Sequence, residues 1–123
     1  MIRAVWSGVA VSDNDRLSHS RQGRMFANKD YTAFKDGMAW CIRPLVRPRA
    51  DAIDGTYHGR VSVTLRVDLP PRMDTSAVIK ACGDAIELSG AIANDNQIDK
   101  WTVERVGRSP RGESRIEFEI EEV

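Results

Sequence analysis

The stretch that decides the fold is residues 70–97, PPRMDTSAVIKACGDAIELSGAIANDNQ. It follows a run that alternates apolar and polar side chains, and its own apolar positions recur at helical spacing from Thr75 to about Ser89. Gly90 is a natural C-terminal stop for that helix. The stretch therefore predicts the end of a strand, a helix and a polar loop, in that order.

Some of the charged side chains along this stretch have the types and positions that a metal-binding or catalytic site needs. Asp74 precedes the helix, Lys80 and Asp84 lie within it, and Asp95 lies in the loop that follows. Carboxylates at a strand end, a helix start and a loop suit a divalent metal, and a nearby lysine suits a phosphate. A simpler interpretation is that Asp74 is only the N-cap of the helix. These residues alone leave both interpretations open.

The clearest strand is predicted at residues 60–69, where apolar and polar side chains alternate strictly until Pro70. A helix is predicted to begin at Asn28, whose side chain can cap the N–H groups of Asp30 and Tyr31, and to end near Pro44. Its core-facing residues are predicted to be Tyr31, Phe34, Met38, Cys41 and Ile42. In the second helix we expect Val78, Ala81, Cys82, Ala85 and Leu88 to point inward.

The remaining segments complete the expected order of elements. Residues 2–7 are predicted to be a short strand, and residues 98–106 and 115–120 a hairpin with a basic connector. Residues 8–27 are expected to be a long irregular segment, whose length favours a functional loop. The order β-α-β-α-β-β predicts an α+β (mixed α/β) fold in a single domain, residues 1–123, with two helices packed on a mixed sheet.

Composition sets the class of protein. The chain has 123 residues, of which 41% are hydrophobic and 29% charged, as in ordinary globular domains. Its apolar runs are too short for a transmembrane helix, and its N-terminus is too short and polar for a secretory signal. Cys41 and Cys82 are expected to be buried thiols, so we expect a cytoplasmic protein.

Charge is unevenly spread although the formal net charge is zero. Residues 16–49 carry eight basic and two acidic side chains, a net of +6, whereas residues 113–123 carry five acidic and one basic, a net of −4. A basic first third can bind phosphates, but two solvated surfaces of opposite sign would give the same pattern. Glycine-rich phosphate loops, Cys/His zinc clusters and nucleophile motifs are absent from the sequence, which leaves metal-assisted phosphodiester chemistry.

Two motifs resemble those of the RusA family of Holliday-junction resolvases, small endonucleases common in prophages. Residues 10–35, AVSDNDRLSHSRQGRMFANKDYTAFK, resemble the opening motif of that family, although Ala10 and Val11 stand where proline is usual. The residues that match are Ser12, Asn14, His19, Arg21, Gly23, Arg24, Tyr31 and Lys35.

The central stretch resembles the catalytic motif of the same family. Asp74 takes the place of its first aspartate, Lys80 of its lysine, and Asp95 of its last aspartate, ahead of Gln97. The second aspartate of the motif falls on Ser76, its asparagine on Ala77, and the first residue of its double aspartate on Asn94. These differences from the family motif remove carboxylates that would bind the metal. The resemblance therefore supports the fold more strongly than the catalytic activity.

The resemblance implies a Mg²⁺-dependent endonuclease, with Mn²⁺ as a possible substitute, that resolves four-way DNA junctions in recombination and repair. It implies a homodimer acting on branched DNA, because a junction has two-fold symmetry. The implied catalytic residues are Asp74, Lys80 and Asp95, the implied metal ligands are Asp74, Ser76 and Asp95, and the implied DNA-binding residues are Arg16, His19, Arg21, Arg24 and Lys29.

Two alternatives stay open. The first is a catalytically impaired protein that binds DNA junctions, since Ser76 and Asn94 replace expected aspartates. The second is a small α/β protein of unrelated function. The site also has a geometric condition, because a helix from residue 75 to 87 is about 18 Å long and Asp95 must return along it to meet Asp74. If it does not, either a partner subunit supplies Asp95 or the site lies elsewhere.

Overall fold

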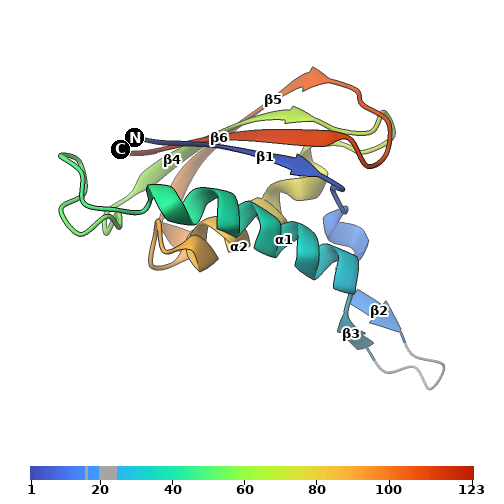
Figure 1. Ribbon diagram of the computed structural model, residues 1–123, viewed down its shortest axis with the longest axis horizontal. Helices are drawn as coiled ribbons and strands as arrows, with labels where there is room; N and C mark the ends of the chain where they lie inside the picture. The colour runs from blue at the N-terminus through green and yellow to red at the C-terminus, as the bar shows by residue number, and fades with distance from the viewer. Residues whose placement is uncertain (16, 20–24) are drawn as a thin grey trace.

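A computed structural model of the chain describes residues 1–15, 17–19 and 25–123. Its main sheet has the strand order β1-β6-β4-β5, and α1 and α2 pack together on one face of that sheet (Figure 1). β6 is antiparallel to both β1 and β4, whereas β5 is parallel to β4. The predicted mixed sheet with two packed helices is therefore confirmed. The elements are β1 (Ile2–Gly8), α1 (Lys29–Ile42), β4 (Val61–Asp68), α2 (Ile79–Ser89), β5 (Ile98–Gly107) and β6 (Ser114–Glu122).

The first helix forms as its sequence predicts. The Asn28 side chain accepts hydrogen bonds from the backbone N–H groups of Asp30 (2.8 Å) and Tyr31 (3.3 Å). The helix ends at Ile42, and Pro44 lies in the short 3-10 turn that follows. Its buried residues are Tyr31, Phe34, Met38, Ala39 and Ile42, while Cys41 is only partly buried.

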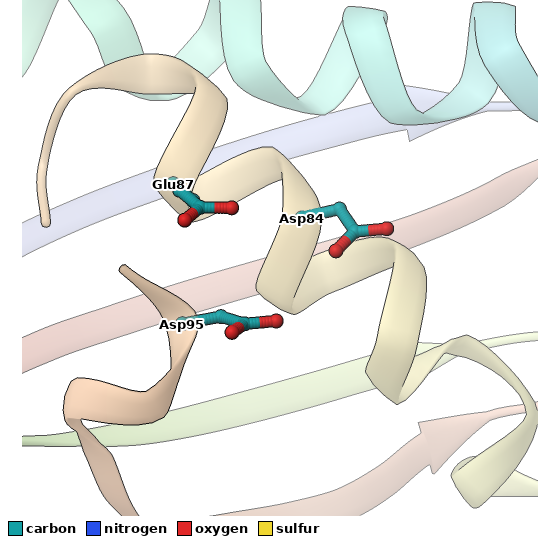
Figure 2. Close-up of side chains that lie close together, drawn as sticks. All are labelled: Asp84, Glu87 and Asp95. Atoms are coloured by element: carbon teal, nitrogen blue, oxygen red, sulfur yellow. The ribbon is translucent and has the colours of Figure 1, made fainter. Parts of the chain in front are cut away.

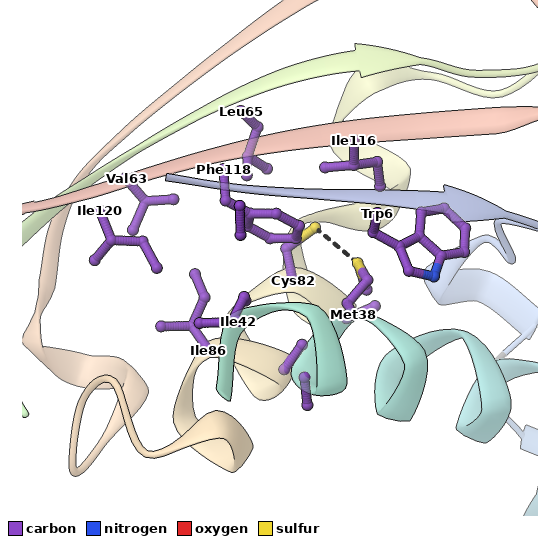
Figure 3. Packing of buried hydrophobic residues seen from close by; sticks show 14 of the residues in the cluster. Trp6, Met38, Ile42, Val63, Leu65, Cys82, Ile86, Ile116, Phe118 and Ile120 are labelled. Atoms are coloured by element: carbon purple, nitrogen blue, oxygen red, sulfur yellow. Dashed lines mark hydrogen bonds between the residues drawn. The ribbon is translucent and has the colours of Figure 1, made fainter. Parts of the chain in front are cut away.

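The core lies between the helices and the apolar face of the sheet (Figure 3). The alternating side chains of β4 divide as predicted, since Val63 and Leu65 are fully buried and Thr64 is partly exposed. Trp6 of β1 packs against Phe34 of α1 with ring centroids 4.8 Å apart. Burying these apolar side chains is the main stabilisation of the fold.

The predicted hairpin of the last two strands is wrong. β5 and β6 do not pair with each other, because β4 lies between them and pairs with both. Their connector crosses the end of β4, where Gly107 and Arg115 are both register partners of Asp68. Ser109 Oγ donates a hydrogen bond to Asp68 Oδ1 at 2.5 Å, which fixes the crossing.

The expectation of an irregular segment over residues 8–27 is also wrong in part. A 3-10 turn, η1 (Asp13–Asp15), precedes two short antiparallel strands, β2 (Leu17–His19) and β3 (Met25–Ala27). These strands form an arm beyond the N-terminal end of α1 (Figure 1). Three-residue strands carry too little alternation to be recognised from sequence.

The second helix differs from its prediction in two ways. Residues 75–78 form a 3-10 turn, η3 (Thr75–Val78), before α2 begins. Leu88 is 47% exposed, because the buried stripe continues through Ile86 and Ser89 instead. Gly90 ends the helix with φ 87°, in the left-handed conformation that glycine adopts without strain. Among the described residues, no helix is both long enough and apolar enough to cross a membrane.

Candidate active site

Asp74 lines a groove at the end of β4. The groove has a volume of about 520 Å³ and lies between η1, the start of α1, and the turn that follows β4. The Asp74 carboxylate makes no capping hydrogen bond to η3, although it occupies the N-cap position. The interpretation of Asp74 as only a cap is therefore wrong. The charged residues that line the groove are Asp15, Asp30, Arg72, Asp74 and Arg111.

The start of α2 is capped instead by Asp13 from η1. Its two carboxylate oxygens accept from the backbone N–H groups of Lys80 (3.0 Å) and Ala81 (3.1 Å), and Tyr31 Oη donates to it at 3.1 Å. A continuous α-helix from Thr75 would pair the Lys80 N–H with the Ser76 carbonyl. Asp13 takes that donor, which accounts for the change from η3 to α2.

We expect Asp13→Ala to lower the free energy of unfolding by about 2 kcal/mol, because it leaves two helix N–H groups and the Tyr31 hydroxyl without this acceptor. Asp13→Asn keeps one carbonyl acceptor and should lose about half as much. Urea unfolding followed by circular dichroism measures both. Asp15→Ala, in the same turn and exposed, is the matched control; equal stability of the two alanine variants would contradict the capping role.

A second acidic group lies further along α2. Asp84, Glu87 and Asp95 each present a carboxylate oxygen within 4.8 Å of the other two (Figure 2). Asp84 and Glu87 come from one side of the helix, and Asp95 comes from the 3-10 turn η4 (Asp95–Gln97) that faces it. Lys80 Nζ lies 3.7 Å from Asp84 Oδ2, one helical turn earlier. We refer to Asp84, Glu87 and Asp95 as the acidic group.

The turn that carries Asp95 is fixed by a buried amide. Gln97 Oε1 accepts from the N–H groups of Ala93 (2.8 Å) and Asn94 (3.0 Å), and Gln97 Nε2 donates to the carbonyls of Tyr57 and Gly59, both at 2.9 Å. The Asn94 side chain caps the same turn by accepting from the Asn96 N–H at 2.9 Å. Asn94 therefore has a structural role, in which an aspartate would serve equally well.

The turn that carries Asp95 packs against α2 at Gly83. A Cβ atom at Gly83 would lie 3.5 Å from the Trp101 ring and 3.9 Å from Asp95 Cβ. Asp95 therefore packs against the middle of α2, beside Asp84. This packing leaves Asp95 beside the carboxylates of Asp84 and Glu87.

Asp74 and Asp95 are not brought together within one chain. Asp95 packs beside Gly83, which lies nine residues after Asp74 along η3 and α2. At 1.5–2 Å of rise per residue, nine residues correspond to roughly 15 Å. Ligands of one Mg²⁺ ion must each lie about 2 Å from it. Among the described residues, the acidic group accordingly contains Asp95 but not Asp74.

The other predicted residues fall into three sets. Ser76 and Lys80 are exposed on η3 and the first turn of α2, and Lys29 is exposed at the start of α1. His19 belongs to β2, where its backbone is paired with that of Met25. The predicted DNA-binding residues Arg16, Arg21 and Arg24 lie outside the described residues.

Sequence reasoning missed Asp13, Arg72, Glu87 and Arg111 in this region. Glu87 was detectable, because it follows Asp84 at the i, i+3 spacing that puts two side chains on one side of a helix. Arg111 lines the groove only because the connector crosses the end of β4. Asp13 lies 67 residues before Lys80, and no local pattern signals its capping role.

The two thiols are not activated nucleophiles. Burial raises the pKa of the Cys82 thiol well above its ordinary value, and the negative charge of Asp13 adds to this effect. Burial also raises the pKa of Cys41. Both cysteines are free thiols, so they remain protonated near neutral pH. Thiol-based catalysis is therefore not supported.

Comparison with protein-family models shows the family to which the chain belongs. The family model described as Endodeoxyribonuclease RusA matches residues 8–121. The chain belongs to the RusA family. The match includes the arm, the groove at Asp74 and the acidic group. A search of curated proteins gave no match. RusA membership implies an endonuclease that acts on Holliday junctions in DNA recombination, and RusA nucleases generally depend on a divalent metal.

Proposed function

We propose that this chain is a Mg²⁺-dependent, structure-selective endonuclease that resolves four-way DNA junctions, with Mn²⁺ able to replace Mg²⁺. The observation that carries the proposal is the RusA match over residues 8–121, which includes all the candidate site residues. The acidic group supports it, since aspartate and glutamate oxygens are the donors that Mg²⁺ prefers.

The residues present fit a divalent metal. Three carboxylates within 4.8 Å supply hard oxygen donors from two elements, and Gln97 and Asn94 hold one of those elements in place. Asp84, Glu87 and Asp95 would hold the metal. A bound Mg²⁺ supplies an activated water and offsets charge on the phosphate. Lys80, exposed beside Asp84, would offset further negative charge on the scissile phosphate.

We further propose a homodimer in which Asp74 and Ser76 of one subunit face Asp95 of the other. Roughly 15 Å of helix separates Asp74 from Asp95 within one chain, too far to share a metal. Two-fold symmetry suits both a homodimer and a four-way junction, which needs paired cuts. Each composite site would then combine carboxylates from both subunits.

The DNA contacts would come from the basic side chains near the groove. Arg72 and Arg111 line it beside Asp74, and their guanidinium groups suit phosphate oxygens. From the family resemblance we also propose DNA contacts by Lys29, at the start of α1, and by His19, Arg16, Arg21 and Arg24. We also propose that residues 1–123 form one domain, that it acts in the cytoplasm and that it derives from a prophage.

An impaired junction-binding protein is the second candidate, and Ser76 is the observation that favours it. Its exposed hydroxyl brings no charge where the family motif has an aspartate. We expect Ser76→Asp to raise the rate of junction cleavage at limiting Mg²⁺ by about tenfold, because an added anionic ligand strengthens metal binding. Quenched-flow or gel assays with a labelled junction measure this rate.

The outcomes of this experiment separate the two candidates. Cutting by the wild-type chain that Ser76→Asp accelerates supports the nuclease. Cutting by Ser76→Asp alone supports the impaired protein. Thr75→Asp adds the same charge one position earlier on η3 and is the matched control. If Thr75→Asp accelerates cutting as much as Ser76→Asp, the position of Ser76 has no special role.

A further inference from the structure

An exposed tryptophan lies on the outer side of the helical layer. Trp40, in the last turn of α1, is 66% exposed, whereas Trp6 is buried in the core. The guanidinium of Arg43 lies 5.1 Å from the centroid of the Trp40 ring, within the range of a cation–π contact. Tryptophan and arginine are both enriched among the residues that contribute most of the binding energy at interfaces.

The arginine on this ring is itself held in place. Arg43 Nη2 donates a hydrogen bond to the Leu88 carbonyl at 3.2 Å, which links the end of α1 to the end of α2. Leu88 is 47% exposed and follows Glu87 of the acidic group directly in the chain. The pair of Trp40 and Arg43 therefore borders the element that carries two of the three carboxylates.

The chemistry of this pair favours a nucleobase as its ligand. An aromatic ring beside a guanidinium offers stacking to a base and a positive charge to its phosphate, a combination typical of surfaces that bind unpaired nucleotides. Bases in continuous duplex are stacked on one another and cannot reach such a ring, whereas bases at a branch point can leave the stack at lower cost.

We propose that Trp40, with Arg43 beside it, stacks on an unpaired base at the branch point of the DNA and so contributes to selectivity for branched over linear DNA. The proposal rests on the proposed function, because it takes branched DNA as the substrate. It adds an aromatic contact on the helical layer, outside the groove and the arm. The stacking contact would strengthen binding of the junction and would not change the rate of the chemical step.

The test compares Trp40→Ala with wild type in binding, by fluorescence anisotropy, to a labelled four-way junction and to a linear duplex of the same sequence, with Ca²⁺ in place of Mg²⁺. Loss of one base stack corresponds to about 5- to 100-fold weaker junction binding. Duplex binding should change less than about twofold, and Trp40→Phe should keep most of the affinity for the junction. Leu88→Ala, which removes a neighbouring exposed apolar side chain, is the matched control and should leave both affinities unchanged.

Four results would overturn the proposal. Equal weakening of junction and duplex binding, or no weakening of either, would show that Trp40 does not select branched DNA. A shift of Trp40→Ala from dimer to monomer in sedimentation would identify the ring as a contact between copies of the chain. If wild type binds no junction even at low salt, the proposed function fails as well, whereas normal junction binding by Trp40→Ala overturns only the stacking role.

Discussion

Replacing Asp95 with asparagine should reduce metal-dependent cleavage of a four-way junction by at least about 100-fold. Asp95 is the member of the acidic group that comes from the opposing turn, so its loss removes the carboxylate that closes the group against α2. Asparagine keeps the size of the side chain but removes a negative charge from the proposed metal ligands. The measurement is the rate of strand cleavage at saturating Mg²⁺ with a labelled junction.

Asp99→Asn is the matched control for this prediction. Asp99 lies four residues further along the chain, is exposed, and pairs at 3.5 Å with Arg60 rather than with the acidic group. It should cut at close to the wild-type rate, since exposed ion pairs contribute little. Junction binding by Asp95→Asn in Ca²⁺ should persist. Normal cutting by Asp95→Asn would remove Asp95 from the catalytic site.

Mixing two inactive variants should restore cutting if the site is shared between subunits. Asp74→Asn and Asp95→Asn should each be inactive as homodimers, because every composite site lacks one carboxylate. In a mixed dimer, one composite site carries both substitutions and the other carries neither. When the two variants are mixed equally, about one half of the dimers are mixed, and each of these has one intact site. About a quarter as many sites should therefore be active as in the wild-type protein.

The readout for the mixture is nicking of one strand rather than full resolution. A mixed dimer has a single intact site, so it should cut one strand of the junction and leave the paired cut unmade. Refolding the two variants together ensures that subunits exchange. A mixture that stays inactive while wild type refolds to full activity would place Asp74 and Asp95 in the same subunit. Cutting by Asp74→Asn alone would exclude Asp74 from the site.

Local sequence patterns predicted the helices and most strands of the main sheet, but not which strands pair with each other. The helix capped by Asn28 and the strand from Val61 were predictable. The capping residue, the helical spacing of apolar residues and the alternation of the strand are all local features of the sequence. The pairing of β5 and β6 was not, because both strands alternate in a way that suits a hairpin. The three-dimensional structure distinguishes a hairpin from the observed sheet, because it shows β4 between β5 and β6, with Asp68 beside the connector that crosses it.

The candidate site was predictable to a similar extent. The opening motif over residues 10–35 and the order of Asp74, Lys80 and Asp95 together indicated the family, because a motif needs only residue types and spacing. The meeting of Asp95 with Asp84 and Glu87 depends on how the turn that carries Asp95 packs against α2, which no spacing rule contains. The cap from Asp13 joins residues 67 positions apart, and long-range contacts of this kind appear only once the chain is folded.

Cleavage of a synthetic four-way junction by the wild-type chain tests the central claim most directly. The junction and a linear duplex of the same sequence are incubated with the protein at low salt, with Mg²⁺ and then with excess EDTA. We predict strand cuts near the branch point of the junction in Mg²⁺, none in EDTA and none in the duplex. Absence of cutting in both Mg²⁺ and Mn²⁺, or equal cutting of junction and duplex, would contradict a metal-dependent, structure-selective endonuclease.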